Sequence, residues 1–115
     1  MMKNYKKFIL IFFPFLLFSQ TELFEKKNFI VENDTLRYRI LAPLDYDANK
    51  KYPVHLFLHG AGERGSDNEL QLFHGSNLFL NNNNRKKYKS WVIFPQSPKN
   101  DWWGGYTIHT NTIMM

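Results

Sequence analysis

Two short apolar runs with a helical stretch between them constrain the fold of this chain more than any other sequence feature. Residues 54–59 and 91–94 are almost continuously apolar, which is typical of strands that are covered on both faces. Residues 69–80 between them favour a helix, with Asp67 or Asn68 as its N-cap. Strand, helix and strand within about 40 residues are the unit of a parallel sheet, so an α/β fold is predicted.

A β-hairpin is predicted ahead of this unit. Residues 23–30 and 35–42 are rich in β-formers, and the turn-forming residues 32–34 separate them. In the second run, apolar and aromatic side chains alternate with Arg37 and Arg39, which predicts a strand with a dry apolar face and a wet face carrying both arginines. A hairpin that leads into a parallel unit predicts a mixed sheet.

Residues 1–19 have the three-part layout of a secretory signal peptide. Three lysines precede the apolar run at residues 8–18, and the small residue Ser19 follows it. As a helix this run covers roughly 16 Å, about half of the hydrocarbon core, so no stable membrane anchor is expected. We expect a secreted or periplasmic protein that is cleaved near Ser19, with residues 20–115 as its one domain.

Composition argues against several classes of site. The chain carries 15 Lys and Arg against 10 Asp and Glu, but three lysines lie within residues 1–19, which leaves 12 bases against 10 acids. The dense basic cluster at residues 85–89 adjoins an asparagine tract and predicts a solvated surface, without nucleic-acid binding. The lack of cysteine excludes iron–sulfur clusters and thiolate zinc sites. His55 and His59 would lie roughly 13 Å apart on a strand, so we expect no metal and no cofactor.

The glycine-rich turn at residues 60–65 allows three interpretations. Its spacing matches the G-x-G-x-x-G turn of dinucleotide-binding folds, but Glu63 would place a carboxylate where the pyrophosphate sits. A phosphate-binding P-loop is excluded because Ser66 and Asp67 stand where its Lys and hydroxyl residue are required. The turn could instead be a tight strand exit without further function. It could also be an oxyanion hole, whose backbone amides point at the oxygen that becomes negative during acyl transfer.

A longer stretch around this turn resembles a known family. Residues 52–68, which include the string HGAGERG at residues 59–65, resemble α/β-hydrolases of the esterase, phospholipase and prolyl-oligopeptidase-like group. Residues 91–102 are similar to the next strand and loop of the secreted esterases in that group. The resemblance covers residues 37–103.

This resemblance implies a partial α/β-hydrolase sheet, made of an N-terminal antiparallel hairpin and a parallel strand-helix-strand unit and incomplete as a hydrolase domain. In the family's sheet order, the strand at residues 54–59 lies between the strand at residues 91–94 and the strand that carries the nucleophile. One edge of this strand would therefore be open. An open apolar edge on a domain of about 96 residues predicts low autonomous stability.

The resemblance also implies a function for the loop. The backbone amides of Ala61 and Gly62 would stabilise the tetrahedral intermediate formed from an ester or peptide carbonyl. Trp102 and Trp103 follow a strand end, where ligand sites form in open α/β sheets. They are expected to bind substrate, with ordinary packing of their aromatic rings as the alternative.

Two side chains next to the loop are expected to act structurally. Arg64 would brace the loop through an ion pair with Asp67 or Glu69. His59 would orient the loop through hydrogen bonds.

The sequence lacks the catalytic residues that such a hydrolase needs. None of its five serines lies in a G-x-S-x-G elbow, and no acid and histidine follow such an elbow. We therefore expect the N-terminal portion of a serine hydrolase, inactive alone, whose ester or peptide substrate would be that of the full-length parent. The alternative is a secreted carbohydrate- or lipid-binding module that uses a loop with Trp102, Trp103 and Tyr106.

Overall fold

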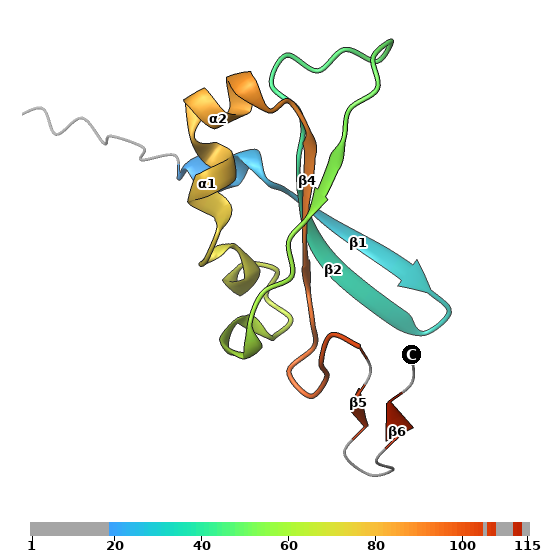
Figure 1. Cartoon of the computed structure of the whole chain (residues 1–115). Helices are drawn as coiled ribbons and strands as arrows, with labels where there is room; N and C mark the ends of the chain where they lie inside the picture. The colour runs from blue at the N-terminus through green and yellow to red at the C-terminus, as the bar shows by residue number, and fades with distance from the viewer. Residues whose placement is uncertain (1–18, 105, 108–111, 114–115) are drawn as a thin grey trace, which may run out of the picture.

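The computed structural model describes residues 19–104, 106–107 and 112–113, so the predicted signal segment before Ser19 lies outside the described residues. Four strands form a mixed sheet in the order β1-β2-β4-β3, and their bounds are β1 (Glu25–Val31), β2 (Asp34–Leu41), β3 (Val54–Leu56) and β4 (Trp91–Gln96). β2 pairs antiparallel with β1 and with β4, whereas β3 pairs parallel with β4 (Figure 1). The predicted hairpin, the parallel unit and the partial α/β sheet are confirmed.

Short helices connect β3 to β4 on one side of the sheet (Figure 1). They are the 3-10 turns η2 (Ala61–Glu63) and η3 (Leu70–Leu72) and the α-helices α1 (Ser76–Leu80) and α2 (Asn82–Lys87). A further 3-10 turn, η1 (Gln20–Leu23), precedes β1, and the two-residue strands β5 (Tyr106–Thr107) and β6 (Thr112–Ile113) pair with each other. In the part of the chain that the structure describes, no helix has the length and apolarity to cross a bilayer.

The helix predicted over residues 69–80 is broken at Gly75. Gly75 has a φ of 82°, in the left-handed region that favours glycine, and it separates η3 from α1. A Cβ at this position would lie 2.5 Å from the ring of Phe57, so close packing also requires glycine here. Of the two predicted caps, Asp67 is the one that acts, because its carboxylate accepts hydrogen bonds from the amides of residues 69 and 70. The asparagine tract begins α2, with Asn81 as its cap.

The assignment of faces on β2 is wrong. Arg39 is only 1% exposed and Leu41 is buried on the same face, while Leu36 on the face predicted to be dry is 37% exposed. The physical reason is that the helices lie over the face that carries the arginines, where the guanidinium of Arg39 finds hydrogen-bond acceptors. Alternation alone identifies two faces but does not say which of them becomes covered.

The core lies between this face of the sheet and the segment from η3 to α1. Its buried apolar members are Phe24, Leu41, Leu72, Leu80, Val92 and Phe94. Phe57 stacks on Phe94 at 4.6 Å between ring centroids, and Phe24 meets Phe94 edge-on at 5.2 Å. Aromatic contacts at these distances add to the stabilisation from apolar burial.

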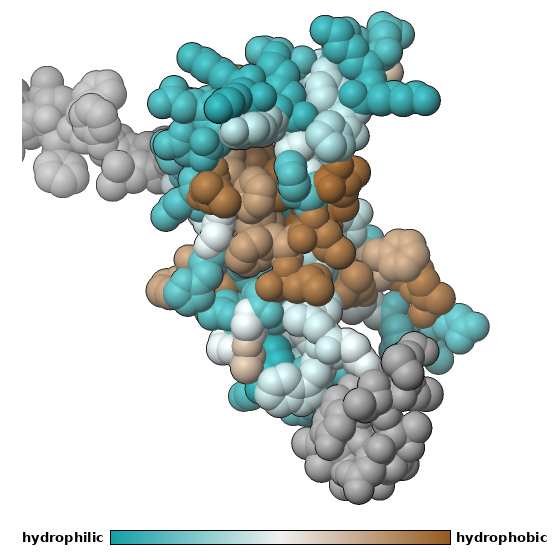
Figure 2. Space-filling view, viewed as in Figure 1, coloured by the Kyte–Doolittle hydropathy of each residue, from teal (hydrophilic) through white to brown (hydrophobic). Residues whose placement is uncertain are grey.

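The sequence predicts that both apolar strands are covered on both faces, and only β4 is buried or half-buried along its whole length. β3 is the edge strand of the sheet, and Val54, Leu56 and Leu58 are 60%, 62% and 48% exposed. Figure 2 shows a continuous apolar surface over α1 and the β3 edge. The open edge expected from the family's sheet order is therefore present, whereas low autonomous stability stays a prediction.

Candidate functional site

The loops that follow β3 and β4 lie at the same end of the sheet, because the two strands are parallel (Figure 1). After β3 the backbone is extended at Gly60 and then turns into η2, where the amide of Glu63 donates to the Gly60 carbonyl at 3.3 Å. Within the described ranges, the amides of Ala61 and Gly62 donate to no backbone or side-chain acceptor. Both residues are exposed, and within the described part of the chain their N–H groups are left for an acceptor from outside it.

His59 joins the start of this loop to the residue after β4. Its Nδ1 lies 2.6 Å from the Gly60 carbonyl oxygen, and the amide of Ser97 donates to its Nε2 at 3.0 Å. An amide can only donate, so these partners assign the proton of the imidazole to Nδ1. The side chain is 5% exposed. The structure thus contains hydrogen bonds through which His59 can orient the loop, as expected from the sequence.

The structure brings Trp102 and Trp103 next to the glycine loop. The indole N–H of Trp103 donates to the His59 carbonyl at 3.0 Å. The indole ring of Trp103 meets the imidazole ring of His59 edge-on, with 5.1 Å between ring centroids. The guanidinium of Arg64 lies over the Trp102 ring at 4.0 Å, a cation–π distance. Both indoles therefore contact the loop. Trp102 is 43% exposed and Trp103 is 37% exposed, so part of each side chain also faces solvent.

The prediction that Arg64 forms an ion pair with Asp67 or Glu69 is wrong. Its Nε donates to the Ala61 carbonyl at 2.9 Å, and its guanidinium also reaches the Asp101 carbonyl at 3.4 Å. Arg64 therefore links the glycine loop to the tryptophan loop through backbone carbonyls. Glu69, one of its expected partners, pairs instead with Lys26 and Arg39.

Sequence reasoning missed Gln96, a buried side chain that holds the other end of the loop. Its Oε1 accepts from the Asn68 amide at 2.7 Å, and its Nε2 donates to Asp67 Oδ1 at 2.7 Å and to the Glu63 carbonyl at 3.2 Å. The backbone carbonyl of the next residue, Ser97, accepts a hydrogen bond from the amide of residue 65 at 2.9 Å. The signal in the sequence was the abrupt change from an apolar strand to Gln and Ser opposite a glycine-rich turn.

Comparison with known proteins adds a structural relative. No family model and no curated protein matches this sequence. A solved structure described as that of a thermostable esterase matches at 32% sequence identity with a TM-score of 0.68. The chain has the fold of part of an esterase-like α/β-hydrolase. The match covers 74% of this chain but 24% of the esterase, so this esterase-like segment spans about a quarter of that protein's length.

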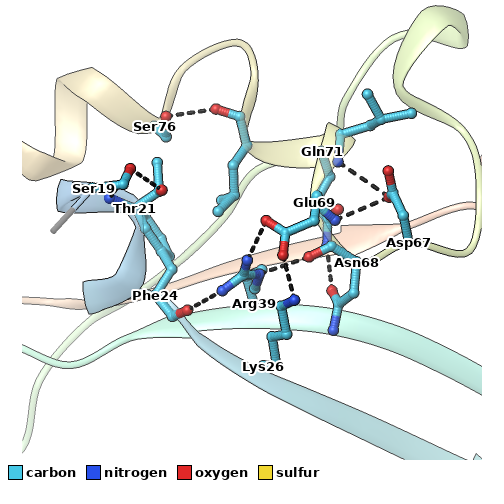
Figure 3. Close-up of polar contacts among 12 residues, drawn as sticks. Ser19, Thr21, Phe24, Lys26, Arg39, Asp67, Asn68, Glu69, Gln71 and Ser76 are labelled. Carbon is cyan, nitrogen blue, oxygen red and sulfur yellow. Dashed lines mark hydrogen bonds and ion pairs between the residues drawn. The ribbon is translucent and has the colours of Figure 1, made fainter. Parts of the chain in front are cut away.

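A buried arginine links the hairpin of the esterase-like segment to the residues that follow its glycine loop (Figure 3). Arg39 Nη1 donates to the Phe24 carbonyl at 2.6 Å, and its Nε donates to the Asn68 carbonyl at 2.7 Å. Its Nη2 pairs with the carboxylate of Glu69 at 2.5 Å, and Lys26 pairs with the same carboxylate. The three donors thus reach two segments, the end of η1 and the consecutive residues 68 and 69. These acceptors compensate the guanidinium charge for the loss of water on burial.

Two carboxyl groups around the loop have lowered pKa values. The hydrogen bond from Lys26 lowers the pKa of the Glu69 carboxyl, and the charge of Arg39 adds to this effect, against the opposing effect of burial. Burial raises the pKa of Asp67, but the hydrogen bonds from Gln96 and from the amides of residues 69 and 70 outweigh it, so the net pKa is lowered.

The lowered pKa values predict a loss of stability in acid. A carboxyl with a lower pKa in the folded state stabilises fully above its unfolded-state pKa, about 3.9 for Asp and 4.3 for Glu, and loses this effect as the pH falls through the folded-state value. We expect the urea midpoint to drop between about pH 5 and about pH 3. Glu69→Gln, measured in parallel, should show a smaller drop, and an equal drop would contradict the assignment.

The described histidines, His55, His59 and His74, do not form a metal site with the described acidic residues. Within the described ranges no three groups among His, Asp and Glu lie close enough together to hold a metal ion. His74 Nε2 lies 3.5 Å from a carboxylate oxygen of Glu63, and His55 Nδ1 lies 3.0 Å from Ser90 Oγ. His109 lies outside the described residues.

Proposed function

We propose that this chain supplies the oxyanion-hole loop of a serine hydrolase that cleaves carboxylic esters or peptides, and that it does not hydrolyse them alone. The observation that carries the proposal is the pair of amides at Ala61 and Gly62, which have no acceptor among the described residues. They lie on a loop held at both ends, in a segment that is 32% identical to an esterase. Attack on an ester carbonyl gives its oxygen a negative charge, and preorganised N–H groups stabilise that charge without reorganising.

The indoles of Trp102 and Trp103 are proposed to form one wall of the substrate site. They lie beside the glycine loop and keep part of their surface exposed. Their contacts with His59 and Arg64 also fix the loop, and nothing favours a separate carbohydrate- or lipid-binding module. Export through the segment before Ser19, without a stable membrane anchor or a nucleic-acid partner, remains part of the proposal.

The chain alone is expected to release no p-nitrophenol from short-chain acyl esters above the buffer rate. The reason is chemical: acyl transfer by this class of enzyme begins with attack by an elbow serine, and the sequence has none. The purified 115-residue chain is assayed with p-nitrophenyl acetate and butyrate. Steady turnover that scales with chain concentration would refute the proposal.

A chimera tests the oxyanion loop itself. The matching segment of the thermostable esterase is replaced by that of this chain, and ester hydrolysis is expected to be retained. Ala61→Pro in the chimera should lower kcat about 100-fold, because proline removes one donor from the oxyanion hole. Proline suits this position otherwise, since it follows extended backbone at Gly60 and opens a helical turn.

Ala61→Gly is the matched control, because it keeps the N–H and should leave kcat within a few-fold of the parent chimera. A folded Ala61→Pro chimera with undiminished kcat would contradict the oxyanion role. A folded chimera without any hydrolysis would contradict the proposed function as a whole.

A further inference from the structure

We propose that Gln96 is a positioning residue whose side-chain amide sets the direction of the Ala61 and Gly62 N–H groups. The inference rests on the proposed function only for what those two groups do. The orientation of these two groups depends on the hydrogen bonds that Gln96 makes, whatever ligand the groups bind.

Gln96 contacts the glycine loop and the two residues 67 and 68 beyond it, and the two ends of its side-chain amide have opposite hydrogen-bonding roles. Its Oε1 accepts from the Asn68 amide, while its Nε2 donates to the Glu63 carbonyl and to the Asp67 carboxylate. An amide N–H can only donate, so the contact with Asn68 assigns which end of the side chain is oxygen. Glutamate would lack the donor and methionine would lack both functions, so the site is specific for the residue type.

The contact with Glu63 acts directly on the short turn that carries the free amides. Glu63 is the last residue of η2, and Ala61 and Gly62 are its first two residues. Fixing the Glu63 carbonyl therefore fixes the orientation of a one-turn segment from its far end. The near end is fixed by His59, whose imidazole lies against the Gly60 carbonyl.

The packing around Gln96 leaves the loop little room to move. The side chain is 2% exposed, and a Cβ on Gly65 would lie 3.3 Å from its Nε2. The Asn68 backbone has a left-handed φ of 56°, and its carbonyl accepts from Arg39 on the hairpin. Gln96 thus connects the free amides to a segment that the buried arginine already anchors.

The test measures order in the loop of the full 115-residue chain by 15N relaxation. In the parent chain the amides of Ala61 and Gly62 should have order parameters of about 0.85, typical of rigid backbone. In Gln96→Glu, where the carboxylate lacks the donor and faces Asp67, these values should fall below about 0.6 while those of β2 and β4 stay unchanged.

A second substitution distinguishes positioning from general destabilisation. In Gln96→Glu with Asp67→Asn, the asparagine amide can donate to the new carboxylate, so the contact with residue 67 is restored with its direction reversed, whereas the Glu63 carbonyl still lacks its donor. The double variant should therefore regain melting temperature but keep the low order parameters at Ala61 and Gly62. Recovery of loop order in this variant would show that the contact with Glu63 does not hold the turn and would overturn the inference.

Gln96→Met replaces the first variant if Gln96→Glu fails to fold, because it keeps the volume and removes only the polar contacts. Ser90→Ala is the matched control, since it removes a buried hydroxyl at the opposite end of β4 and should leave the loop ordered. Unchanged order parameters at Ala61 and Gly62 in folded Gln96 variants would overturn the inference. So would an equal loss of loop order in Ser90→Ala. Neither outcome bears on hydrolysis by the chimera, so the two proposals fail independently.

Discussion

Arg39→Met is expected to destabilise the fold by about 2–5 kcal/mol and to leave the chain largely unfolded at room temperature. The carbonyls of Phe24 and Asn68 lose their donor, and both residues are buried, so each unsatisfied group costs about 1–3 kcal/mol. Glu69 adds little, because its side chain is 48% exposed and water can replace the arginine. A loss of this size is comparable with the whole stability expected of a small domain.

Urea denaturation followed by circular dichroism measures this change. Arg37→Met is the matched control, since Arg37 lies two residues earlier on the same face and is only half-buried. It should change the free energy of unfolding by less than about 0.5 kcal/mol. Arg39→Lys should be intermediate, because an ammonium keeps the charge but cannot present the guanidinium's planar fork. A midpoint for Arg39→Met equal to that of the parent would show that the network does not stabilise the fold.

Gly75→Ala is expected to cost about 2–4 kcal/mol, from two separate effects. The new Cβ would lie 2.5 Å and 2.7 Å from ring carbons of Phe57. This ring packs against Phe79 of α1 and Phe94 of β4, so it cannot yield without repacking the core. The left-handed backbone at φ 82° adds strain for any residue with a Cβ.

Gly104→Ala separates the two effects. Gly104 also has a positive φ, 101°, but a Cβ there would meet no atom of the described residues within 4 Å. This variant should therefore cost only the backbone strain, about 1 kcal/mol. Phe57→Leu combined with Gly75→Ala should cost less than the sum of the single changes, because the smaller side chain relieves the overlap. Strictly additive costs would show that the ring is not the obstacle.

The exposed edge of β3 explains why such changes should be severe in this chain. The apolar side chains of β3 and part of α1 face solvent, so the domain buries less apolar surface than its composition would allow. When the free energy of unfolding is small, a destabilisation of a few kcal/mol is enough to unfold the domain.

Much of the candidate site was predictable from the sequence, because local patterns encode it. The run of apolar residues ending at His59, followed by glycines, predicts a strand exit with exposed amides. A second apolar run after a helical stretch predicts a parallel strand. Parallel strands end on the same side, so the placement of Ala61 near Trp102 and Trp103 followed from the topology.

The supporting residues could not be predicted in the same way. Arg39 alternates with apolar neighbours just as a solvent-facing arginine would, and its acceptors lie 15, 29 and 30 residues away in the sequence. Gln96 interacts with a loop 28 to 33 residues before it. Such contacts depend on the chain's path through space, which no local pattern records.

The sequence alone determined the order and type of the main strands, the hairpin, the position of the glycine loop and the absence of an elbow serine, because periodicity, turn residues and motifs act over a few neighbouring residues. The tertiary structure decided which face of β2 is buried, where the connecting helix breaks, how exposed β3 is and which side chains hold the loop. These outcomes depend on which segments meet, since a buried polar group such as Arg39 is tolerated only where distant acceptors surround it.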